Sequence, residues 1–183
     1  MAVDVEDIEY RLSVPSASAG DSDAQGDTNA SLGGYMSTTE LSSGQVGNLF
    51  DTLSGDDNQN EVEHYRCLFV TNTNATDDWV NVTVWIAEEV AGGADAEIGL
   101  DPAGVVASDS STDQAETVVD DTTAPSGVSF SAPSTSGTAI EIPGGGTIGA
   151  GECIAIWVKR IATDSGPIAE DGITIRTTGE TAE

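Results

Sequence analysis

The chain has 183 residues, of which 32 are acidic and only 5 are Lys or Arg, so its formal net charge is −27. This charge argues against direct binding of nucleic acid, because phosphate contacts require Lys and Arg. The apolar runs are far shorter than the about 20 residues of a membrane-spanning helix. The acidic start, MAVDVEDIEY, lacks the basic region of a secretory signal peptide, so we expect neither a signal peptide nor a membrane partner.

The acidic residues are spread along the whole chain, and Lys159 is its single lysine. Their mutual repulsion opposes folding at low ionic strength, whereas at molar salt charges are screened within roughly 3 Å. An even acidic coat of this kind indicates adaptation to concentrated salt, as in haloarchaea and their viruses. The alternative, a disordered acidic chain, conflicts with several clear strand-like runs.

The length suits one domain with an arm, and we expect a β-sandwich domain over 61–183 preceded by a 1–60 region with a strand, an extended arm and a short helical turn. In 8–14, apolar and polar residues alternate, which predicts a half-buried strand. Residues 15–34 lack apolar periodicity and predict the arm. The stretch STTEL is a helix-start pattern, but the glycines that follow allow only one or two turns.

The stretch EHYRCLFVTNTNATDDWVNVTVWI holds two strand-like runs, 63–70 and 80–86, joined by a turn-rich connector. In the first run Tyr65, Cys67 and Phe69 share one face, because side chains alternate along a strand. The simplest arrangement is an antiparallel hairpin.

Later strand candidates are AEIGL, ETVV, GVSFSAP and TAIEIPGGG, followed by ECIAIWVKRIA at 152–162 and GITIRTT at 172–178. In 152–162, Ile154, Ile156 and Val158 oppose Cys153, Ala155 and Trp157. Short strands separated by Gly and Pro, with hardly any helix, predict an all-β fold: an antiparallel β-sandwich, either Ig-like or jelly-roll.

The single histidine, His64, is the obvious test for a catalytic or metal site. It lies three residues from Cys67 in an extended run, so the two side chains point to opposite faces and cannot act together. We expect His64 to be an exposed residue at the start of a strand. Cys67 and Cys153 are expected to be buried free thiols, with a disulfide between neighbouring strands as the alternative.

No cofactor and no catalytic residue is expected, since carboxylates are too frequent for any pair to be informative. Asp21, Asp23 and Asp27 alternate as in a calcium loop but lack the remaining ligands of an EF-hand. They form either a solvated acidic loop or a weak site for structural or non-specific cations. Asn74, in the connector TNTNATDDW, is the best of three glycosylation sequons.

Several short stretches form a recognisable set: NASLGG, STTEL, NLFDTLSG, EHYRCLFVTNT, VTVWI, TAPSGVSFSAP and GGGTIGAGECIAIWVKR. They resemble a family of small virion proteins encoded in the structural gene modules of tailed bacteriophages. The similarity spans roughly residues 29–176, and it implies a virion structural protein without a catalytic residue. The stronger acidity here fits a haloarchaeal tailed virus.

The resemblance and the composition together predict a protein of the virion, assembled in the host cytoplasm and exposed to a salty medium. We expect it to be a capsid decoration or turret protein that forms a ring or trimer and contacts the major capsid protein or other virion proteins. A neck, tail or baseplate component is the first alternative. The expected interface residues are Tyr10, Leu12, Tyr35, Leu49 and Phe50.

An alternative from another class is a carbohydrate-binding or hydrolytic surface module of a halophile. It predicts a concave site lined by Trp79, Trp85 or Trp157 beside carboxylates. In a sandwich, however, Trp85 and Trp157 are more often core residues.

Overall fold

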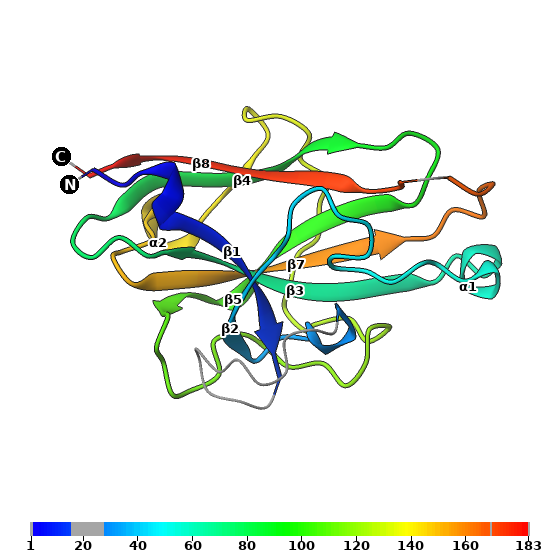
Figure 1. The fold of residues 1–183 in the computed structure, drawn as a ribbon, viewed down its shortest axis with the longest axis horizontal. Coiled ribbons are helices and arrows are strands. Elements are labelled where there is room, and N and C mark those ends of the chain that lie inside the picture. Colours follow the sequence, from blue (N-terminus) through cyan, green and yellow to red (C-terminus); the bar gives the residue numbers. More distant parts are fainter. Residues whose placement is uncertain (1, 16–27, 169, 183) are drawn as a thin grey trace.

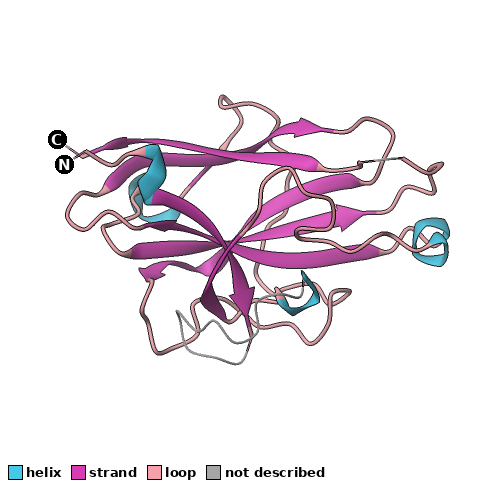
Figure 2. Ribbon diagram, viewed as in Figure 1, coloured by secondary structure: helices cyan, strands magenta, loops and turns pink. Residues whose placement is uncertain are grey.

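The computed structural model describes residues 2–15, 28–168 and 170–182 and shows an all-β antiparallel sandwich (Figures 1 and 2). One sheet has five strands in the order β2-β1-β3-β7-β5, and the other has three in the order β6-β4-β8. The elements are η1 (Val5–Asp7), β1 (Ile8–Val14), η2 (Thr28–Ala30), β2 (Tyr35–Glu40), α1 (Gly55–Gln59), β3 (Glu63–Asn72), β4 (Trp79–Glu89), β5 (Asp95–Ala107), β6 (Ile140–Glu141), α2 (Pro143–Gly146), β7 (Glu152–Ile161) and β8 (Ile173–Thr181).

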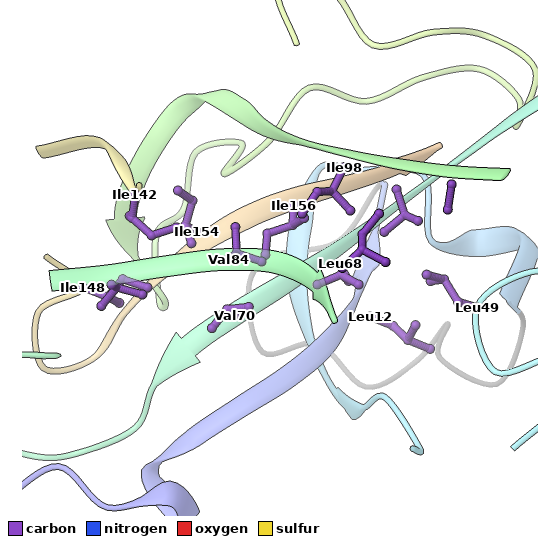
Figure 3. Close-up of a cluster of buried hydrophobic side chains, with 14 of the residues drawn as sticks. Leu12, Leu49, Leu68, Val70, Val84, Ile98, Ile142, Ile148, Ile154 and Ile156 are labelled. Carbon is purple, nitrogen blue, oxygen red and sulfur yellow. The ribbon is translucent and has the colours of Figure 1, made fainter. Parts of the chain in front are cut away.

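The space between the sheets is filled by an inner cluster of mostly aliphatic side chains, part of which is drawn in Figure 3. It forms because β3 and β7, at the centre of the larger sheet, place every second side chain on this face. Burying a side chain such as Ile156 or Leu68 contributes about 1.5–3 kcal/mol. The buried members are Leu12, Leu49, Leu68, Val70, Trp79, Val82, Val84, Ile86, Ala96, Ile98, Ile142, Ile148, Ile154, Ile156 and Val158.

The other face of the five-stranded sheet is also covered, because long connections pack an outer cluster against it. Trp157 lies at its centre and is fully buried. The strand faces predicted for 63–70 and 152–162 are thus confirmed, and both faces are buried. The buried members are Met36, Tyr65, Cys67, Phe69, Ala115, Val118, Cys153, Ala155 and Trp157.

A buried carboxylate ties this outer layer together. Asp101 is 2% exposed and accepts hydrogen bonds from Trp157 Nε1 at 2.9 Å and from the backbone nitrogens of Ala103 at 2.9 Å and Glu116 at 3.0 Å. A buried carboxylate is tolerated only with such a set of donors. Gly33 allows its backbone to pass directly over the Glu116 carbonyl, where a Cβ would clash.

The predicted hairpin between 63–70 and 80–86 is wrong. β3 lies between β1 and β7 in the larger sheet, whereas β4 lies between β6 and β8 in the smaller one. Both edges of β3 are used by strands from elsewhere in the chain, so the connector carries the backbone from one sheet to the other. Asn72 fixes this crossing, since its Nδ2 donates to the carbonyls of Asp77 at 3.0 Å and Ile148 at 3.1 Å.

The N-terminal region is part of the sandwich rather than a separate unit. β1 pairs along β3, as its alternation predicted, so the division expected at residue 60 does not separate two folded bodies. The helix start expected at STTEL is wrong, because 35–40 form β2 against β1, and the only α-helix of this region among the described residues is the short α1. Of the expected arm at 15–34, residues 16–27 lie outside the described residues.

The later strand candidates are confirmed in part. AEIGL belongs to the longer β5 and GITIRTT to β8, whereas ETVV makes only an isolated bridge between Thr117 and Gly33. Both cysteines are buried free thiols, as expected. Burial raises the pKa of the Cys153 thiol to about 12.

Candidate functional site

Edge strands present unpaired backbone groups, so we compared the two long ones. β5 carries the acidic residues Asp95 and Glu97 and also Pro102, and its pairing with β7 is interrupted between Leu100 and Val105. Charge, proline and bulges are the usual means by which proteins block an edge. β8 is a regular strand of nine residues without proline, and it carries no net charge because its two charged residues, Arg176 and Glu180, cancel.

The irregularities of the smaller sheet lie in β4 instead of β8. Between Val80 and Thr83, β4 carries one more residue than the facing stretch of β8, and Asn81 there has φ = 56°. A second irregularity follows at Ile86. Among the described residues β8 pairs with β4 alone, so its outer edge stays regular and unpaired (Figure 1).

A cavity of about 500 Å³ opens beside this strand, between β8 and the start of β1. Its walls are mostly apolar, with Ile175 of β8 facing Ile8 and Tyr10 of β1, and Arg176 and Asp4 are its charged lining residues. The full lining is Val3, Asp4, Val5, Ile8, Tyr10, Trp79, Ile175, Arg176, Thr177, Thr178 and Gly179.

The two sheets meet across the cavity through a small set of contacts. The hydroxyl groups of Tyr10 and Thr177 lie 2.8 Å apart and share a hydrogen bond, and burial raises the pKa of Tyr10. Trp79, 7% exposed, packs against Gly179 so closely that a Cβ at residue 179 would clash with the indole. Only glycine therefore fits this position in β8.

The N-terminal segment forms another wall of the cavity. The Val3 backbone nitrogen donates to the Thr181 hydroxyl at 2.9 Å. Asp4 and Asp7 cap each other's backbone around η1. The Asp7 carboxylate accepts a hydrogen bond from the Asp4 backbone nitrogen and another from the Asn74 side chain. Both bonds lower the pKa of Asp7, and the one from Asp4 has the larger effect. The segment is thus held beside the end of β8 by side-chain contacts and does not occupy the strand's backbone edge.

Arg176 differs from the other basic residues of the chain. Arg11, Arg66 and Lys159 each form an ion pair, and the Arg160 guanidinium stacks on Phe50. For Arg176, within the described part of the chain, there is no ion pair or hydrogen bond, although the protein has 32 acidic residues. An exposed and unpaired cation on an open strand edge is available to an acidic group of a partner.

A second polar site lies under the 41–54 segment at the other end of the sheet. His64 and Arg160 are cross-strand neighbours on β3 and β7, and Arg66 is two residues along the same face. The Phe50 ring lies 5.5 Å from the Arg66 guanidinium and 4.8 Å from that of Arg160. Two guanidinium groups therefore lie over one ring, and His64 is the cross-strand neighbour of Arg160.

His64 is buried, with 6% exposure, so the expectation of a surface histidine is wrong. The reason is that the 41–54 segment folds over the start of β3, which local sequence does not reveal. Burial, followed by the charge of Arg160, lowers the pKa of His64. Arg66 is held by Asn29 at 2.7 Å and Asp121 at 3.0 Å, and Arg160 donates to the Asp51 carbonyl at 2.6 Å. Through this bond and the Phe50 ring the cluster acts as a clasp that fastens segment 41–54 to the sheet.

The predicted interface residues fall into two groups. Leu12 and Leu49 belong to the inner cluster of a single chain, so their burial needs no partner. Tyr10 lines the cavity, and Tyr35 and Phe50 are half-buried. The structure therefore brings one of the five, Tyr10, to the cavity beside β8.

Asp21, Asp23 and Asp27 lie outside the described residues. No group of three or more His, Cys, Asp or Glu side chains in the described ranges is arranged to hold a metal ion.

Asn74 is 8% exposed, and its side-chain nitrogen donates to Asp7 at 2.9 Å, so a glycan there would require this contact to break. No described helix is long and apolar enough to span a membrane.

The residues that sequence reasoning missed are Arg176 and Gly179. A lone arginine in a strand has no motif, and its importance depends on which strand lies at the edge.

A scan against protein-family models, a search of curated proteins and a search of solved structures found no match.

Proposed function

We propose that the protein is a virion structural protein of a halophilic tailed virus, most simply a capsid decoration or turret protein that acts by protein–protein assembly. The observation that carries the proposal is the open edge of β8, regular and without net charge in a chain of net charge −27. Edge strands without protection serve for pairing with other chains. The resemblance of residues 29–176 to virion proteins of tailed bacteriophages supports the same conclusion.

The rest of the molecule suits this role. The larger sheet is packed on both faces, which makes a stiff support for the exposed strand. At molar salt the screening length is roughly 3 Å, so acidic subunits can approach one another and short-range contacts decide the outcome.

The test is a count of copies per particle in purified virions by quantitative mass spectrometry. A number comparable with that of the major capsid protein supports a decoration protein. A small fixed number supports the neck, tail or baseplate instead. Absence from the particles contradicts the proposal.

A carbohydrate-binding module is the second candidate, because Trp79 lines the cavity. Trp157 is fully buried, and neither Trp157 nor Trp85 lines the cavity. Binding to a glycan array at molar salt, reduced by Trp79→Phe and unchanged by Trp85→Phe, would favour this alternative.

A further inference from the structure

We propose that β8 pairs antiparallel with β8 of a second copy about a two-fold axis at Thr178, joining two three-stranded sheets into one of six strands. This deepens the proposed assembly function by naming the first partner and the surface. The occupant is a second copy because the strand is complementary to itself in both shape and charge.

The faces of β8 restrict the possible registers. Ile173, Ile175 and the other odd-numbered residues are half-buried toward the inner cluster, and the even-numbered residues are exposed. Directly opposed residues of paired strands point to the same face, and a slip by one residue would turn the apolar side outward. Even-numbered residues must therefore face even-numbered residues.

Charge selects one of the remaining registers. With Thr178 opposite itself, Arg176 of each copy faces Glu180 of the other, and both ion pairs form at once. Centring the axis on Arg176 or on Glu180 would instead place like charges opposite each other, which is unfavourable. Because a two-fold axis repeats each contact, one arginine and one glutamate per chain are enough to form two ion pairs in the dimer.

The edge is free to receive this partner. The N-terminal segment reaches β8 through the Thr181 side chain and the cavity, and no strand in the described ranges pairs with the outer backbone edge. Glu180 accepts from Asn81 Nδ2 at 3.1 Å, which fixes the carboxylate on the exposed face. The added strand would also extend the inner face beside the cavity, where Val5 is 81% exposed.

The first experiment measures the oligomeric state of the full chain in molar NaCl by sedimentation velocity. We expect a dimer whose dissociation constant rises at least about tenfold in R176E and in E180R, because each places like charges opposite at two symmetric positions. The double variant R176E/E180R should restore dimerisation. E88R, at an exposed residue of β4, changes the net charge as E180R does and should leave the dimer intact.

The second experiment tests the register. T178C should form a disulfide-linked dimer on mild oxidation, because the two residues lie directly opposite each other. T174C, equally exposed on the same face, should not, since residue 174 faces residue 182 in this register. The native cysteines are buried and do not interfere.

A wild-type chain that stays monomeric at high concentration in molar salt would overturn the inference. A dimer that is indifferent to R176E and E180R, or that T174C cross-links as well as T178C, would also overturn it. The assays use purified protein, so they separate this inference from the proposed function: the dimer can form even if virions lack the protein. Conversely, virions can contain it if β8 stays unpaired.

Discussion

The two sheets of the sandwich differ in how completely they are covered. In the five-stranded sheet the central strands β3 and β7 are buried on both faces, and its edge strand β5 is blocked by charge, Pro102 and an irregular register. The three-stranded sheet is buried on one face, and its edge strand β8 is regular and open. The difference indicates a division of roles, in which the larger sheet stabilises the fold and the smaller sheet presents a pairing edge.

The largest effect is expected at the centre of the larger sheet. Trp157→Ala removes a fully buried side chain and leaves Asp101 without its Nε1 donor. We expect a loss of about 3–5 kcal/mol in the free energy of unfolding, measured with urea in molar NaCl. Val119→Ala, at a residue 86% exposed, is the control and should change it by less than about 0.5 kcal/mol. Equal effects of the two changes would contradict the role given to this sheet.

A smaller effect is expected where the smaller sheet meets the cavity. In Gly179→Val the new side chain clashes with the Trp79 indole. Displacement of the ring should lower the free energy of unfolding by about 1–3 kcal/mol. Gly172→Ala is the matched control, because a Cβ there meets no other atom. Thermal unfolding of both variants measures the difference. A variant at 179 as stable as the wild type would show that this contact is not required.

Alternation of side chains was enough to predict β1, β8 and the two faces of β3 and β7, because the period of two is a local property. Pairing is not local, and the hairpin prediction failed because β1 and β7 reach β3 from distant parts of the chain. At STTEL a helix-start pattern was overridden by tertiary contacts, since the Met36 backbone nitrogen donates to Gln114 at 2.7 Å.

The functional surface was less accessible to sequence reasoning than the fold. The pattern of 172–178 predicted a strand, but nothing local distinguishes an edge strand from a central one. Arg176 became informative only when the other basic residues were seen to have partners. His64 was misjudged for a similar reason, because its cover comes from a segment that has no regular structure.

A third prediction concerns the clasp over the end of the larger sheet. In Phe50→Leu the chain keeps an apolar residue but loses the ring on which Arg66 and Arg160 stack, which should cost about 0.5–2 kcal/mol. Val46→Ala, in the same segment and at a residue 80% exposed, should have no measurable effect. Hydrogen exchange should locate the change in segment 41–54. Faster exchange spread evenly over both sheets would argue against a local clasp.

The smallest effect is a pH dependence at the same place. Burial and Arg160 lower the pKa of His64 below its ordinary value of 6.5, and Arg66 adds to this, while Asp121 and Asp57 oppose it. The folded state thus favours the neutral imidazole, so its contribution to stability is complete above pH 6.5 and is lost as the pH falls through the lowered pKa. The many carboxylates titrate in the wild type and in His64→Gln alike, so the difference in stability between these two proteins isolates the contribution of His64. Unfolding by urea at pH 8 and pH 5 should show the wild type losing more stability than the variant on acidification, and an equal loss in both would exclude His64 as the cause.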